Sequence, residues 1–173
     1  MAISLQQLTE AARNAAAIRT RTTLQPAGGD GDKVFPPTYL GSKYAEEVRI
    51  DPETGAEVKC VLLDSVQSQA NRMEDALQAA VDSEQISLPL LVVDFGEAEL
   101  IDEVGRISSL QVPHRVADAI LRDSTLGGEA FRSSEVGKRI DRVSVTNATP
   151  LFDVCPTALL FGMWDSTGPK GGL

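Results

Sequence analysis

The sequence predicts an α+β fold, and three segments carry that prediction. Residues 46–64, "EEVRIDPETGAEVKCVLLD", place a proline and a glycine between two β-rich runs, which is typical of a hairpin. Residues 65–81 repeat apolar side chains at helical spacing and predict an amphipathic helix that docks on a sheet. Residues 88–95, "LPLLVVDF", form a continuous apolar run, which predicts a central strand covered on both faces.

The N-terminal stretch predicts a helix, a strand and a loop. Residues 4–17 begin with a serine and a glutamine at capping-box spacing, ahead of a helical pattern. Residues 18–25 alternate with the period of a half-buried strand, and Arg19 and Arg21 share its open face. Residues 26–38 are rich in glycine and proline, so we expect a mobile loop.

The C-terminal third predicts two short helices and a strand. Residues 112–124 and 133–143 have helical patterns, and the residues predicted to point inward are Val116, Ile120, Leu121, Val136, Ile140 and Val143. Residues 158–165, "ALLFGMWD", return to strand character and lead directly into the glycine-rich sequence at the end of the chain.

The formal charge of −9 is unevenly distributed along the 173 residues. Residues 1–25 carry +2, residues 26–110 carry −11 and residues 111–173 carry 0. An acidic average argues against a nucleic-acid partner, because phosphate binding depends on basic surface. The segmental values leave room for a local basic track in an otherwise acidic protein.

Several classes of protein are disfavoured by composition. No run of eighteen apolar residues or secretory signal pattern is present, so we expect a cytoplasmic protein that does not bind membranes. Cys60 and Cys155 lie far apart, which predicts buried thiols rather than a disulfide framework or a zinc site. His114 is the only histidine, so no serine or cysteine triad is indicated except through that ring.

Four stretches together resemble the Csb family of CRISPR-associated proteins, which supplies the backbone subunit of type I-U (also called I-G) Cascade. They are "VLLDSVQSQANRMEDAL", "PHRVADAILRDS", "EAFRSSEVGKRI" and above all "CPTALLFGMWDSTGPKGGL". The resemblance covers most of the chain from about Leu62 onward. It implies a single RRM-like (ferredoxin-like) domain of the RAMP superfamily over residues 1–173, with inserted loops. Family members continue into a further helix after the glycine-rich loop, so we expect a truncated chain and an incomplete palm.

The glycine-rich loop is the best candidate site in the sequence. Small residues let backbone N–H groups approach a phosphate, and a lysine neutralises its charge. The order of residues differs from a Walker A loop, because the lysine precedes the glycine pair and no hydroxyl follows it. The alternative is an ordinary turn between a strand and a helix. The residues concerned are Ser166, Thr167, Gly168, Lys170, Gly171 and Gly172.

Two further groups of polar residues are candidates for contact with RNA phosphate or ribose. Gln69, Asn71 and Arg72 lie on the predicted polar face of the helix at residues 65–81. An ion pair between Arg72 and the acids at positions 74 and 75 would explain the same residues without a ligand. Arg19 and Arg21 suit the open face of an RNA-binding sheet, and ordinary surface arginines are the alternative.

The remaining candidates have a structural alternative each. His114 and Arg115 stand at a predicted helix N-terminus, which favours anions, although a lone histidine is more often structural. Trp164 is suited to stacking on a base, but it follows an apolar run and is predicted to lie in the core. Asp94 and Asp165 are isolated acids at strand ends, and we predict no metal site or nuclease activity for them.

The function that these observations favour is non-catalytic. A scaffold that holds many guide sequences needs contacts to phosphate, sugar and base faces, and it needs no cofactor. The resemblance implies CRISPR guide RNA as the ligand, with target DNA bound through the guide. It also implies other copies of the chain and other Cascade subunits as partners in antiviral defence. The alternatives are a nucleotide hydrolase or phosphotransferase that uses the terminal loop, and an acidic protein-interaction module.

Overall fold

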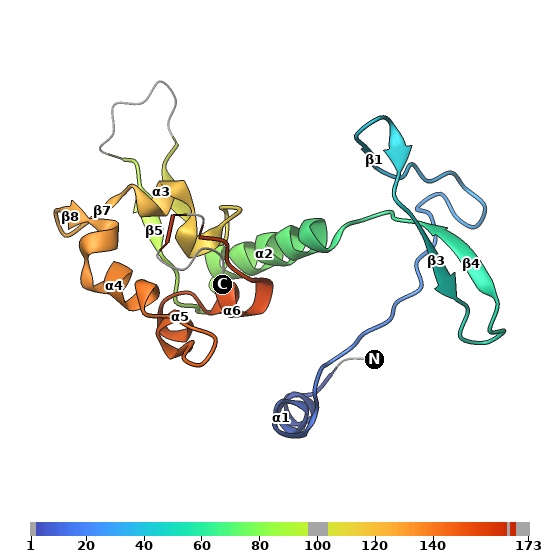
Figure 1. Cartoon of the computed structure of the whole chain (residues 1–173), viewed down its shortest axis with the longest axis horizontal. Helices are drawn as coiled ribbons and strands as arrows, with labels where there is room; N and C mark the ends of the chain where they lie inside the picture. Colours follow the sequence, from blue (N-terminus) through green and yellow to red (C-terminus); the bar gives the residue numbers. More distant parts are fainter. Residues whose placement is uncertain (1–2, 97–103, 166, 169–173) are drawn as a thin grey trace. The chain divides into compact units, whose positions relative to one another are not determined.

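The computed structural model describes residues 3–96, 104–165 and 167–168 (Figure 1). The chain divides into two compact units, Met1–Leu63 (unit 1) and Asp64–Leu173 (unit 2). Both contain helix or strand segments mixed along the chain, which confirms the predicted α+β class. The single RRM-like domain over residues 1–173 stays a prediction.

Unit 1 begins with a helix whose start follows from the sequence. The described elements of this unit are α1 (Leu5–Asn14), β1 (Thr38–Tyr39), β2 (Lys43–Tyr44), β3 (Glu46–Ile50) and β4 (Glu57–Val61). The predicted capping box is confirmed: the Gln7 N–H donates to the Ser4 hydroxyl at 3.2 Å, and the Ser4 N–H donates to the Gln7 side chain at 2.9 Å. No residue of α1 is buried, and Leu5 is 80% exposed.

The predicted strand at residues 18–25 is wrong. The segment is extended coil, and Figure 1 shows it as a thin trace beyond α1. Alternation of side chains makes a strand only where a neighbouring strand pairs with its backbone, and no such partner is described here. The loop at residues 26–38 contains turns near its glycines and reaches β1 without a helix; its mobility stays a prediction.

The predicted hairpin at residues 46–64 is confirmed. Strands β3 and β4 pair antiparallel, with Glu46 opposite Val61 and Ile50 opposite Glu57. The turn is held by Asp51, whose carboxylate accepts hydrogen bonds from the N–H groups of Glu53 and Thr54 at 2.8 and 2.9 Å. Gly55 has φ +71°, a conformation that glycine adopts without a steric penalty.

Unit 2 is built mainly from short helices around two small hairpin-like strand pairs. Its described elements are α2 (Val66–Asp82), β5 (Val92–Asp94), β6 (Arg106–Ser108), the 3-10 helix η1 (Arg115–Ala117), α3 (Ala119–Arg122), β7 (Thr125–Leu126), β8 (Glu129–Ala130), the 3-10 helix η2 (Phe131–Ser133), α4 (Glu135–Asp141), α5 (Thr149–Val154) and α6 (Pro156–Phe161). Within the described chain, all sheets of both units are two-stranded and antiparallel.

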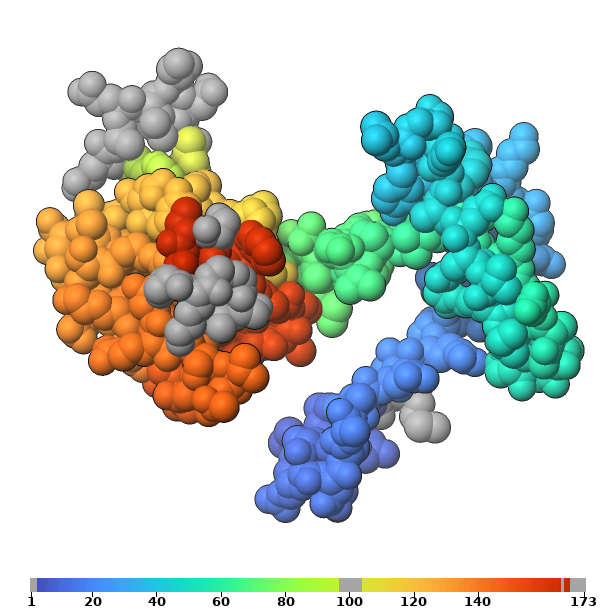
Figure 2. All heavy atoms as spheres, in the orientation of Figure 1, coloured from blue at the N-terminus to red at the C-terminus, as the bar shows by residue number. Residues whose placement is uncertain are grey.

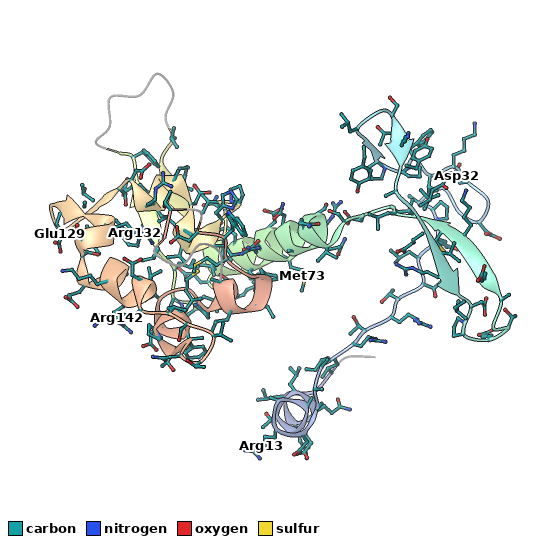
Figure 3. The ribbon with its side chains drawn as sticks, viewed as in Figure 1. Arg13, Asp32, Met73, Glu129, Arg132 and Arg142 are labelled. Atoms are coloured by element: carbon teal, nitrogen blue, oxygen red, sulfur yellow. The ribbon has the colours of Figure 1, made fainter. Side chains whose placement is uncertain are left out.

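The predicted helix at residues 65–81 is confirmed as α2, but only part of it is packed. Met73, on the predicted apolar stripe, is exposed, and Figure 3 labels it on the side of the helix. The buried residue of α2 is instead Glu74. One turn later, Gln78 accepts a hydrogen bond from the hydroxyl of Ser108 in β6. Polar contacts therefore attach α2 to the rest of unit 2.

The apolar run at residues 88–95 is not a central strand. Only β5 forms within it, and it pairs with β6 alone among the described strands, with Val93 opposite Ile107. Val92 is exposed, so the strand is not covered on both faces. Periodicity gives no information about coverage in a continuous apolar run, which is why this expectation failed.

The core of unit 2 lies among its C-terminal helices. It is formed by the side chains Val116, Ala117, Phe131, Ile140, Val143, Leu151, Val154, Cys155, Ala158 and Met163. Figure 2 shows the residues from about 104 to 160 as a closely packed body. The predicted helix at residues 133–143 is confirmed as α4, which the Ser134 hydroxyl caps by accepting from the Gly137 N–H.

Two other predictions for this region need correction. The helix predicted at residues 112–124 is split into η1 and α3, because Asp118 is extended and caps α3, and Ile120 points outward. The strand predicted at residues 158–165 is also wrong, since its first half belongs to α6. Pro156 starts this helix, where its missing N–H is harmless, and Gly162 ends it with φ +85°.

Candidate nucleic-acid interface

The predicted RNA-binding residues occupy different places in the two units. Arg19 and Arg21 belong to unit 1, and the others belong to unit 2. Within unit 2 the described candidates lie in the first half of α2, at the start of η1 and in the turn after α6. Ser166, Lys170, Gly171 and Gly172 lie outside the described residues.

Arginines at the N-terminus are exposed and carry unneutralised charge. Arg13, in the last turn of α1, and Arg19 and Arg21, in the extended segment after it, make no ion pair within the described chain. An exposed guanidinium without a carboxylate partner keeps all its donors available for an anion. We call this segment, residues 13–21, the cationic tether; all of its side chains are exposed.

At the start of α2, Arg72 and Gln69 converge on one carboxylate. The Nε of Arg72 lies 3.2 Å from an oxygen of Asp64, and the Gln69 side chain donates to the same oxygen. Hydrogen bonds from Ser68 and Gln69, then Arg72, lower the pKa of Asp64 to about 2. The expected pairing of Arg72 with the acids at positions 74 and 75 is thus replaced by a pair with Asp64. Because the arginine is exposed, this pair contributes little stability.

Asn71 faces another part of unit 2. Together with Glu74 and Asp75 it lines a cavity of about 240 Å³, whose other wall is formed by residues 110–113. Residues one apart on a helix differ by about 100° in direction, so Asn71 and Arg72 do not act at one point. Asn71 and Arg72, which the sequence analysis placed in one candidate group, therefore face different surroundings.

Arg115 serves the fold. Its side chain is 9% exposed, and that of Glu74 is 4% exposed. Nε and Nη2 of Arg115 donate to the two carboxylate oxygens of Glu74 at 2.6 and 2.7 Å, and Nη1 donates to the Gly162 carbonyl at 2.9 Å. The guanidinium carbon also lies 5.4 Å from the centre of the Phe161 ring. This clamp joins α2 to the end of α6 and leaves Arg115 without a free donor edge.

His114 and the backbone of Arg115 show why an anion site at a helix N-terminus is not built here. η1 is a single 3-10 turn, and Arg115 has φ +52°, which is uncommon for a residue with a side chain. The side chain of this residue is held by the ion pair with Glu74. His114 itself is exposed.

The turn after α6 is organised by a buried carboxylate. Asp165 is bonded to Arg132 Nη2 at 2.6 Å, and its other oxygen accepts from the N–H and the hydroxyl of Thr167, both at 3.2 Å. Burial raises the pKa of Asp165, but Arg132 and Thr167 outweigh burial and hold it below its ordinary value. A Cβ on Gly168 would lie 2.4 Å from Asp165, so glycine is required by close packing. The Thr167 N–H is thus already used within the turn.

Two arginines that sequence reasoning missed lie beside this turn. Arg132, labelled in Figure 3, bridges Asp165 and Asp141, at 2.6 and 3.1 Å respectively. Arg122 reaches the hydroxyl of Thr167 at 3.4 Å from the end of α3. These arginines are 35 and 45 residues from Thr167 in sequence, so no local pattern pointed to them.

Trp164 is not a core residue. It is 61% exposed, although both its neighbours, Met163 and Asp165, are buried. The prediction that placed it in the core depended on the strand at residues 158–165, which α6 replaces. The indole is therefore presented to solvent from a well-anchored stretch of backbone.

The described residues show neither a metal-binding cluster nor a membrane-spanning helix. Within residues 3–96, 104–165 and 167–168, no cluster of three or more histidine, cysteine or acidic side chains is arranged to hold a metal ion. Asp94 faces Arg106 at 3.7 Å. Helices in the same ranges fall short of the length and apolar character that a membrane span requires.

A comparison with known families gives one match. Residues 18–173 match the family described as CRISPR-associated protein GSU0053. Comparison with curated proteins and with solved structures gives no significant match. The matched region covers the hairpin of unit 1, all of unit 2 and both Arg19 and Arg21. The chain therefore belongs to this family of CRISPR-associated proteins.

Proposed function

We propose that the chain is a non-catalytic, guide-RNA-binding backbone subunit of a type I-U (I-G) Cascade surveillance complex. Copies of it, arranged along the guide through an RRM-like palm, would present the RNA bases for pairing with target DNA. Other Cascade subunits complete the complex, which acts in the cytoplasm in antiviral defence. Membership of a CRISPR-associated family supports this proposal, together with the resemblance of the C-terminal motif.

The observation that carries the proposal is the unpaired cationic segment after α1. Arg19 and Arg21 are exposed, extended and free of carboxylates within the described chain. A backbone subunit must hold RNA of any sequence, and arginine contacts to phosphate serve that purpose because they do not read bases. Extended arginine-bearing segments order on RNA when phosphate replaces water around the guanidinium groups.

Contacts from unit 2 supplement this segment. Gln69 and Arg72 are held by the half-buried carboxylate of Asp64, but the Arg72 side chain is 67% exposed, so exchanging this partner for a phosphate costs it little free energy. Further contacts to sugar or phosphate are proposed for Asn71, His114, Thr167 and Gly168, and for the loop residues outside the described chain. Arg115 is not proposed as an RNA contact, because separating it from Glu74 would leave a buried carboxylate without a partner.

RNA binding at increasing salt tests the proposal. We expect affinity for a labelled single-stranded oligoribonucleotide to fall linearly on a log–log plot between about 50 and 200 mM salt. The double variant Arg19→Ala/Arg21→Ala should bind more weakly at every salt concentration. Its slope should be shallower by about 1.4, because each single-strand phosphate contact contributes roughly 0.7.

A matched control separates local contacts from net charge. Lys138→Ala/Arg142→Ala removes the same charge from α4 and its C-cap, where both residues face Glu135 at 3.9 and 3.8 Å. This variant should keep the wild-type slope. Absence of RNA binding, binding without salt dependence, or an equal loss in both double variants would each contradict the proposal.

A further inference from the structure

Trp164 presents an exposed indole at the start of the turn after α6. An aromatic side chain of this size normally buries most of its surface, because its transfer from water is strongly favourable. Trp164 instead leaves 61% of its surface in water. It follows α6 directly, after Gly162 has ended the helix with φ +85°.

The backbone on both sides of Trp164 is anchored. Met163 belongs to the hydrophobic core of unit 2. Asp165 is 6% exposed and makes the hydrogen bonds to Arg132 and Thr167 described above. Because this backbone is already ordered, a ligand that packs on Trp164 restricts only the χ rotations of the indole and does not have to order the chain as well.

A cation suited to phosphate lies beside the same turn. Nη1 of Arg122 reaches the Thr167 hydroxyl, while Nε and Nη2 face the carboxylate of Asp123 at 2.7 and 2.9 Å. Asp123 is largely exposed, and the two residues are adjacent in the chain. A pair of this kind contributes little to stability, so the guanidinium is able to exchange the carboxylate for a bidentate phosphate contact.

Arg132 holds the turn in place through two ion pairs. Its two carboxylate partners, Asp141 and Asp165, are half-buried or buried, and it joins the end of α4 to the turn after α6. It therefore fixes the turn that carries Trp164. In this arrangement Arg132 is a positioning residue, and Arg122 and Trp164 are the groups presented to a ligand.

We propose that Trp164 stacks on an unpaired base of the bound RNA, while Arg122 binds the phosphate beside that base. This inference rests on the proposed function, since it specifies one contact of the RNA-binding surface. Stacking tolerates every base because each has a flat π-face, so the contact is compatible with a guide of any sequence. The side chains bonded in this turn are a guanidinium, a hydroxyl and carboxylates, which suit a polar ligand with a flat base and a phosphate.

The protein has a single tryptophan, so its intrinsic fluorescence reports on this position alone. We expect quenching of that fluorescence when the full chain is titrated with a single-stranded oligoribonucleotide. The same titration with an RNA strand of equal length in which the bases are replaced by abasic sites should give binding, seen by anisotropy of a label, with little quenching.

Variants distinguish stacking from packing. Trp164→Ala should weaken binding of the normal RNA by roughly 5- to 150-fold, since stacking contributes about 1–3 kcal/mol per base. It should leave binding of the abasic strand unchanged, and Trp164→Phe should retain part of the affinity. Arg122→Ala should weaken both strands equally. Phe152→Ala, at a residue of α5 that is 62% exposed, is the matched aromatic control and should bind as the wild type.

The outcomes separate this inference from the function on which it rests. If the chain fails to bind RNA by anisotropy, the proposed function is wrong and stacking falls with it. If RNA binds but the fluorescence is unchanged and Trp164→Ala binds normally, only the stacking inference is wrong. A fluorescence change that follows protein concentration without RNA, and that RNA leaves unaltered, would assign the indole to an interface between copies and overturn the inference.

Discussion

The two units differ in how they are stabilised. Among the described residues of unit 1, from position 3 to 63, no side chain is buried, whereas unit 2 contains a contiguous core centred on Val116, Leu151 and Cys155. A segment without buried apolar surface has little to offset the loss of chain entropy. Burial of apolar surface therefore stabilises unit 2 far more than unit 1, and it contributes least to α1, where no residue is buried.

The same division appears in the electrostatics. Every arginine of unit 2 makes an ion pair: Arg72, Arg106, Arg115, Arg122, Arg132, Arg139 and Arg142. In unit 1, Arg49 of β3 pairs with Glu47 on the same strand, whereas Arg13, Arg19 and Arg21 make no ion pair within the described chain. The arginines of unit 2 are therefore paired with carboxylates of the same unit. The arginines of the cationic tether in unit 1 are unpaired and available to bind an external anion.

The largest expected effect comes from breaking the buried clamp of unit 2. Glu74→Ala should destabilise this unit by about 3–5 kcal/mol, because it leaves the Arg115 guanidinium buried and unpaired. Denaturant unfolding followed by tryptophan fluorescence measures this, since Trp164 lies in unit 2. Glu135→Ala, which removes an exposed carboxylate from its cations, is the control and should cost less than about 1 kcal/mol.

A second variant keeps the clamp test decisive if Glu74→Ala does not fold. Glu74→Leu/Arg115→Met replaces both charges with apolar side chains of similar size, and it should recover most of the lost stability. A loss under about 1 kcal/mol for Glu74→Ala would show that the clamp does not hold α2 to the end of α6.

A matched pair of leucines probes the contrast in burial between the units. Leu151→Ala, at a side chain 3% exposed in the core, should cost about 2–5 kcal/mol through the cavity it leaves. Leu5→Ala, on the open face of α1, should change the free energy of unfolding by less than about 0.5 kcal/mol. Unfolding monitored by far-UV circular dichroism covers both units. An equal cost for the two substitutions would mean that α1 is packed in the free protein and would remove the distinction.

The smallest effect concerns pH at the start of α2. The folded-state pKa of Asp64 is about 2, against an ordinary value of 3.8. A lowered folded pKa means that this carboxylate contributes stability fully above pH 3.8, and that the contribution is lost as the pH falls through about 2. NMR titration of the Asp64 side chain should give a midpoint near 2, and Gln69→Ala should raise it. A midpoint at the ordinary value would show that Ser68, Gln69 and Arg72 are not held there.

Local chemistry allowed much of the secondary structure to be predicted. The capping box of α1, the turn of the β3–β4 hairpin, α2 and the serine cap of α4 all depend on residues within four positions of each other. Predictions failed where a partner distant in sequence was needed. Residues 18–25 had the alternation of a strand but no neighbour, and the run ending at Trp164 was too short for periodicity to separate strand from helix.

The candidate site divides in the same way. The sequence by itself determined that cations concentrate at the N-terminus of an acidic protein, and that Thr167 and Gly168 belong to a glycine-rich turn. Only the tertiary structure decided which cations are free, because the carboxylate partner of an arginine can lie far along the chain or beside it. Arg115 is bound to Glu74 across 41 residues, and Arg122 reaches Thr167 across 45. Residue types fix the charge, but the neighbours in space determine whether that charge is already paired or is available to bind a ligand.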